Sequence, residues 1–173
     1  MNRNRGLLLI PAAAALLVLL LSCTFDYESS AQAASREIPD FILTNASYTV
    51  ARSGERAMMF EAETVRMYSS SQTAVLAAVS MYQEGDESGT TGTCSEARIN
   101  TESLDAVLTG SVMLVSEREG VRLEAERLEW DNGSGELFSG PDDLVLAVYD
   151  DGSRVLGRGF SGDLDLNVFE LQE

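Results

Sequence analysis

The sequence predicts an all-β protein, a β-jellyroll or rolled antiparallel sheet, and three observations carry that prediction. First, β-branched and aromatic residues alternate with polar ones from Phe41 onward, as in strands with one buried face. Second, glycine turn signals such as Asn132-Gly133 and Asp151-Gly152 separate the alternating segments, as in a meander of hairpins. Third, the pattern recurs every 31 to 32 residues, and periodic β units usually stack so that each buries its face on the next.

The N-terminal segment, residues 1–22, is expected to be a lipoprotein signal peptide with a helical core. Arg3 and Arg5 precede an almost wholly apolar stretch, residues 6–21, which is shorter than the ~20 residues of a membrane-spanning helix. The stretch ends in Leu20-Leu21-Ser22-Cys23, which resembles a bacterial lipobox. That motif implies cleavage before Cys23 and lipid attachment to it. The alternative is an uncleaved, slightly short anchor helix. Both possibilities place the remaining residues outside the cytoplasmic membrane.

Residues 23–37 are expected to form a flexible tether, followed by one folded domain over residues 38–173. The tether is rich in serine, alanine and charged residues and lacks a sustained apolar face. Several acyl chains on Cys23 would hold the domain at a membrane, because each buried CH2 group contributes ~0.8 kcal/mol.

The folded domain contains four related units. Each has two apolar or small residues two positions apart, followed by two more whose numbers change from even to odd or from odd to even. This odd or even numbering is called parity below. The units comprise Phe60, Ala62, Val65 and Met67; Gly92, Cys94, Ala97 and Ile99; Leu123, Ala125, Leu128 and Trp130; and Val155, Gly157, Phe160 and Gly162. A second landmark follows at Leu76-Ala77-Ala78, Leu108-Thr109-Gly110 and Phe138-Ser139-Gly140.

A parity switch within a strand predicts a bulge or a sharp corner, because parity decides which face a side chain occupies. Four corners in register would bend one long sheet over on itself into a rolled, two-layer structure. We expect the turning positions to be the small residues Ala62, Cys94, Ala125 and Gly157.

Composition argues against several chemistries. The 173-residue chain has no histidine and no lysine, which excludes histidine-based triads, histidine metal ligands and Schiff-base lysines. A formal net charge of -16 leaves no basic surface for nucleic acid. Glu124 and Glu126 share one strand face opposite the apolar parity, so a solvated face explains them better than an acid–base pair. Cys94 fits a small buried hydrophobe. We therefore expect no enzyme activity, no cofactor and no metal.

Four segments, in their order and spacing, resemble the LptC family of lipopolysaccharide-transport proteins, within the wider LptA/LptC β-jellyroll group. They are FEAETVRMY at residues 60–68, LTGSV at 108–112, GVRLEAERLEWD at 120–131 and GSRVLGRGF at 152–160. The resemblance covers roughly residues 39–171. It implies a membrane-anchored periplasmic protein that receives lipopolysaccharide from an inner-membrane ABC transporter and passes it along a groove to an LptA-like bridge protein. Family members commonly keep an N-terminal transmembrane helix, and the lipobox departs from that pattern.

The apolar interior of the roll is the candidate lipid-binding groove. Its candidate residues share the parity that follows the switch and are expected to face inward on neighbouring strands: Val65, Met67, Ala97, Ile99, Leu128 and Trp130. Because the net charge opposes phosphorylated head groups, binding should depend on acyl-chain burial at ~25 cal/mol per Å². Partner contact is expected at unpaired sheet edges, near residues 41–50 and 164–171.

Two functions remain open at this point. The first is a lipid-anchored periplasmic protein that accepts lipopolysaccharide, or a similar glycolipid, and hands it on. The second is an outer-membrane structural or assembly lipoprotein with no lipid cargo. Thr24 follows the anchor cysteine where some bacteria have an aspartate as a retention signal, so both the inner and the outer membrane stay possible.

Overall fold

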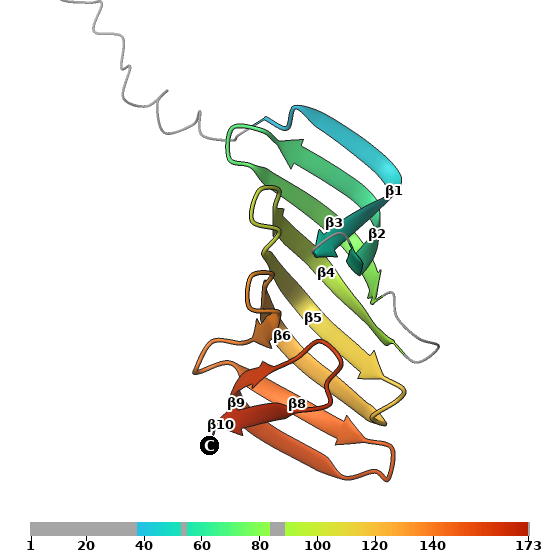
Figure 1. Cartoon of the computed structure of the whole chain (residues 1–173), viewed down its shortest axis with the longest axis vertical. Coiled ribbons are helices and arrows are strands. Elements are labelled where there is room, and N and C mark those ends of the chain that lie inside the picture. The colour runs from blue at the N-terminus through green and yellow to red at the C-terminus, as the bar shows by residue number, and fades with distance from the viewer. Residues whose placement is uncertain (1–37, 53–54, 84–88, 173) are drawn as a thin grey trace, which may run out of the picture. The chain divides into compact units, whose positions relative to one another are not determined.

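A computed structural model describes residues 38–52, 55–83 and 89–172, and this part of the chain forms ten antiparallel strands and no helix (Figure 1). The strands are β1 (Phe41–Arg52), β2 (Glu55–Tyr68), β3 (Thr73–Tyr82), β4 (Thr90–Asn100), β5 (Ala106–Ser116), β6 (Val121–Asp131), β7 (Glu136–Phe138), β8 (Leu144–Tyr149), β9 (Arg154–Gly162) and β10 (Phe169–Gln172). They form one sheet in the order β1-β2-β3-β4-β5-β6-β7-β9-β10, with β8 also between β6 and β9. The all-β, rolled antiparallel fold is therefore confirmed.

β7 and β8 together take the place of one strand interrupted at its middle. β7 pairs with the C-terminal end of β6, and β8 pairs with its N-terminal half. The interruption is fastened to β9, because the backbone N–H of Phe160 donates to Ser139 Oγ at 2.8 Å and Arg158 Nη1 donates to the carbonyl of Asp142 at 2.7 Å. Pro141 lies in this interruption.

The predicted parity switch is present in the long strands. In β2 the buried residues change from Phe60 and Ala62 to Val65. In β4 and β6 the same change occurs, with Ile99 and Leu128 fully buried after the switch. Inward side chains from both halves of the bent strands belong to one hydrophobic core cluster, so the sheet encloses a single interior.

The corners are made differently from what we predicted. Left-handed residues on the alternate strands make the bend: Asn45 (φ 50°) in β1, Ala78 (φ 52°) in β3 and Ser111 (φ 52°) beside Gly110 (φ 77°) in β5. Asn45 of β1 and Ala78 of β3 both lie opposite Glu63 of β2, so the two left-handed residues are aligned across β2. A left-handed residue interrupts the regular pleat, so the strand bends there. Beyond the bend, residues of the opposite parity point to the inner face. The small residues expected to turn the chain, such as Ala62, instead pair beside the corner.

The fourth unit departs from the other three. Val155 pairs with the fully buried Ala147 and therefore faces inward, yet it is 45% exposed. β10 pairs only with residues 158–162 of β9, so the preceding residues of β9 are left at the edge of the sheet.

The two edges of the sheet are β1 and β10. Residues 41–50 therefore lie in an edge strand, as expected, but the edge strand expected over residues 164–171 is shorter than predicted. Residues 164–168 form turns, because Leu166 is left-handed (φ 58°) and its N–H donates to the carbonyl of Asp163 at 3.3 Å. The N–H of Asn167 also donates to Asp163 Oδ1 at 3.2 Å, which is typical of an aspartate-initiated turn.

The expected signal peptide, the tether and the attachment residue Cys23 lie outside the described residues. Within the described ranges, no helix is long and apolar enough to cross a membrane.

Candidate functional site

The six candidate groove residues all face the interior. Val65, Ala97, Ile99, Leu128 and Trp130 are each at most 4% exposed, and Met67 packs against the same core while partly buried. They lie on β2, β4 and β6, which are alternate strands and not the neighbouring strands we predicted. The reason is that one 31- to 32-residue unit spans a hairpin of two strands.

The strands in between supply interior residues that the parity argument missed. Ala74 and Leu76 of β3, and Ala106 and Leu108 of β5, pair directly with the candidates and are at most 2% exposed. Together they give two continuous inward rows across the sheet. The first row is Met67, Ala74, Ile99, Ala106, Trp130 and Leu137, and the second is Val65, Leu76, Ala97, Leu108 and Leu128. Apolar alternation within residues 73–82 and 106–116 was the signal that could have found them.

The interior carries no buried charge in the part of the chain that the structure describes, where the buried polar side chains are Thr90, Ser116 and Ser139. Trp130 Nε1 and Thr90 Oγ1 are buried without a hydrogen-bond partner there. Burying an unpartnered polar group costs free energy, so these two atoms are the local weak points of an otherwise apolar interior.

Cys94 lies among the small residues beside the corner and is 7% exposed. Burial raises the pKa of its thiol to about 11, so the thiol stays protonated near neutral pH. Its Sγ donates to the carbonyl of Glu96 at 3.4 Å. A protonated, buried thiol is a poor nucleophile, which agrees with the structural role expected for this residue.

The outer face carries ion pairs between residues two apart on one strand. Arg122 pairs with Glu124 at 2.8 Å, Arg127 with Glu129 at 2.9 Å, and both pairs are substantially exposed. Pairing with Arg122 explains Glu124 as part of a solvated face. Exposed pairs of this kind contribute little to stability, but they separate a charged outer face from an uncharged inner one.

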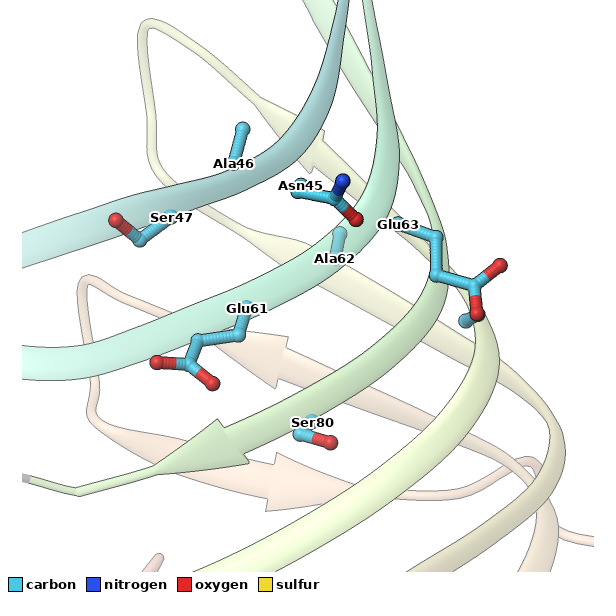
Figure 2. A pocket seen from close by; sticks show the side chains of 8 residues that line it. Asn45, Ala46, Ser47, Glu61, Ala62, Glu63 and Ser80 are labelled. Carbon is cyan, nitrogen blue, oxygen red and sulfur yellow. The ribbon is translucent and has the colours of Figure 1, made fainter.

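A polar cavity of about 500 Å³ lies where β1, β2 and β3 bend (Figure 2). Its lining includes Asn45, Ser47, Glu61, Glu63 and Ser80, all exposed. The lining residues include two carboxylates and no cationic side chain. The cavity would therefore repel a phosphorylated ligand. No group of three or more acidic or thiol side chains within the described ranges is placed to hold a metal, so this cavity does not contribute to the candidate site.

A second cavity, of about 520 Å³, is mainly apolar and lies between β5, β6, β8 and β9. Met113, Leu144, Leu146 and Leu156 line it, and Leu144 and Leu156 are 52% and 66% exposed. Leu156 belongs to the part of β9 that β10 leaves uncovered. This apolar surface beside a sheet edge was not predicted, because its side chains lie on the strand face that we expected to be polar and exposed to solvent.

These features define a class of protein: a β-jellyroll whose uncharged interior suits apolar ligands and whose sheet ends in unpaired edges. The family comparison is more specific. The family model described as "Lipopolysaccharide-assembly, LptC-related" matches residues 8–173, nearly the whole chain, and the chain belongs to this family. None of the curated proteins matches it. Membership assigns the chain a role in lipopolysaccharide transport, in a family of transport components and not of enzymes.

Proposed function

We propose that this chain is a lipid-anchored periplasmic component of lipopolysaccharide export. It accepts lipopolysaccharide from an inner-membrane ABC transporter and passes it through the interior of the roll to an LptA-like jellyroll protein. The observation that carries the proposal is the uncharged, apolar inner face that continues across β1 to β9 within one bent sheet.

The interior suits acyl chains better than head groups. Inward residues such as Ile99 and Leu128 are fully buried, so an entering chain has to separate the two halves of the sheet. Each CH2 group transferred from water returns ~0.8 kcal/mol, and a long acyl chain therefore offsets the lost packing. Phosphorylated head groups remain outside, because the interior has no described cation to pair with them and the chain carries a formal charge of -16.

The sheet edges suit partner strands. At one end of the sheet, β1 pairs only with β2, so its other edge has no partner strand among the described residues. Its consecutive residues Phe41, Ile42 and Leu43 are 49%, 55% and 47% exposed. At the other end Val155 and Leu156 of β9 are exposed beside the apolar cavity. An added strand would gain main-chain hydrogen bonds at either edge and side-chain contacts with these residues. The transporter's partner surface would meet the first edge and the bridge protein the second.

The anchor in this proposal is acylated Cys23, the first residue of the tether over residues 23–37, which would keep the domain at the inner membrane. The alternative is an outer-membrane structural or assembly lipoprotein with no lipid cargo. The close packing of the interior favours that alternative, since residues such as Leu76 and Leu128 are fully buried and already fill the space.

Photo-crosslinking in cells distinguishes the two functions. A side-chain photo-crosslinker at Ile99 or Met67 should capture lipopolysaccharide, because these residues face the interior. Matched positions on the opposite face, Arg66 and Glu129, should not capture it. Equal capture from both faces would remove the groove. Absence of capture from a folded protein would favour the structural lipoprotein.

A further inference from the structure

The two ends of the interior are closed to different extents. At the β1 end, Phe41 and Leu43 pair with Met67 and Val65 and so face inward, yet each is about half exposed. At the β10 end, the turn segment Asp163–Val168 brings Leu164 (7% exposed) and Leu166 (1% exposed) into the hydrophobic core cluster. This segment, here called the strap, follows β9 at the red end of the chain in Figure 1.

The strap is attached to both halves of the bent sheet. On one side it continues into β10, whose Phe169 pairs with Gly162. The ring of Phe169 is tilted by 36° to that of Phe160, with the ring centroids 5.7 Å apart. On the other side, Leu164 and Leu166 pack in the core cluster that includes residues of β5 and β6, and the carboxylates of the strap act on the β5–β6 turn through charge alone. The Glu119 carboxylate raises the pKa of the Arg118 guanidinium in that turn, and Asp165 and Asp163 of the strap raise it further. The burial of Leu164 and Leu166 in the shared core therefore fastens the strap over this end of the interior.

We propose that the strap closes the β10 end of the interior and has to lift before lipid can leave there. This inference rests on the proposed transport function and concerns the regulation of the same groove. The strap can move without dismantling the sheet, because it contributes no ladder hydrogen bonds and its turn bonds are long: 3.5 Å from Asp163 N to the Val168 carbonyl and 3.3 Å from Leu166 N to the Asp163 carbonyl. Segments held in this way open more readily than core strands.

The strap also lies beside the edge at which a receiving protein would add its strand. β10 occupies residues 158–162 of β9, so a partner strand that pairs along all of β9 displaces β10. Displacing β10 pulls on the strap that precedes it. Arrival of the receiving protein and opening of the interior are therefore coupled through one continuous segment.

The test uses the full chain in cells with a photo-crosslinker at Val65, near the β1 end, or at Ala147, near the β10 end. Both residues are buried and face inward. Lipopolysaccharide capture should be clearly greater at Val65 than at Ala147 in the otherwise native chain. Arg118→Glu, which makes the β5–β6 turn repel the strap, should raise capture at Ala147 several-fold and leave capture at Val65 unchanged. Arg122→Glu is the matched control and should change neither.

A second variant and a second readout guard against misfolding. Leu166→Ala should act like Arg118→Glu, whereas Val168→Ala, at a residue 71% exposed in the same segment, should not. In the detergent-extracted full chain, adding purified lipopolysaccharide should speed amide hydrogen exchange in residues 163–172 and leave β5 unchanged.

The outcomes separate the strap from the groove. Capture at Val65 together with unchanged capture at Ala147 in both strap variants would overturn the strap alone, as would hydrogen exchange that does not respond to lipopolysaccharide. Absence of capture at Val65 in folded protein would overturn the proposed transport function and the strap with it.

Discussion

Truncating Leu128 to alanine measures how tightly the apolar interior is packed. Leu128 is fully buried, pairs with the buried Leu108 of β5 and belongs to an inward row with Val65, Leu76 and Ala97. Because these neighbours are held in a hydrogen-bonded sheet, they cannot move far to fill the space that three missing carbons leave. A Leu→Ala change at such a site costs about 3 kcal/mol, within the usual range of ~2–5 kcal/mol.

Urea unfolding of a soluble version that begins after Cys23 tests this value. With a slope of ~2 kcal/mol per molar urea for a domain of this size, Leu128→Ala should lower the midpoint by roughly 1.5 M. Leu156→Ala is the matched control. Leu156 is 66% exposed on the outer face, so its truncation should cost no more than about 0.5 kcal/mol.

Equal midpoint shifts in the two variants would refute the reasoning. That result would mean that Leu128 is not packed in solution and that the halves of the sheet are already apart. A groove that is open without lipid would also remove the need for acyl chains to displace packed side chains.

Four other predictions test separate features. Ala78→Gly should stabilise the domain by about 1 kcal/mol, because it relieves a left-handed alanine, whereas Ala77→Gly should destabilise it by up to about 1 kcal/mol; urea midpoints check both. Cys94 should resist alkylation in native protein up to pH 9 and react on unfolding, because burial raises its pKa to about 11; rapid native labelling would contradict this. A backbone N–H in the β2–β3 turn lowers the pKa of Asp40 below its ordinary value of 3.8. Its stabilisation is therefore present above that value and is lost as pH falls through the folded pKa. Asp40→Asn should weaken the domain at neutral pH and match the native protein well below pH 3.8, as unfolding across pH would show. Mass spectrometry of membrane-extracted protein should find an acylated N-terminal Cys23, and an intact Met1 peptide would contradict that expectation.

The strands and the inner face could be predicted because both depend on parity, which is written directly in the residue pattern. Val65, Ile99 and Leu128 follow from alternation and from its 31- to 32-residue recurrence, and all three are buried. The corner could be located to within a few residues for the same reason. Its construction could not, because Asn45, Ala78 and Ser111 share no side-chain type that marks a left-handed position.

The strap escaped prediction because its pattern imitates a strand. Leu164, Leu166 and Val168 alternate with polar residues as a strand would, and two of these three are indeed buried. What decides against the strand is the Asp163 side chain, which competes for the backbone N–H of Asn167. Aspartate and asparagine side chains often divert the backbone in this way, and alternation alone does not reveal when they do so.

The corner also explains how a single sheet can enclose an apolar interior. In a strand without a corner one parity keeps one face along its whole length, so the apolar residues after the parity switch would lie on the outer face and be exposed. The left-handed Asn45 and Ala78 lie opposite Glu63 of β2. Phe60 and Val65, on either side of Glu63 in that strand, both enter the same interior. Residues beside this corner are small, as Ala62 and Cys94 show. Met67 near the end of β2 is only partly buried, whereas Ile99 and Trp130 at the equivalent positions of β4 and β6 are buried, so the interior is more open toward β1 than in the middle of the sheet.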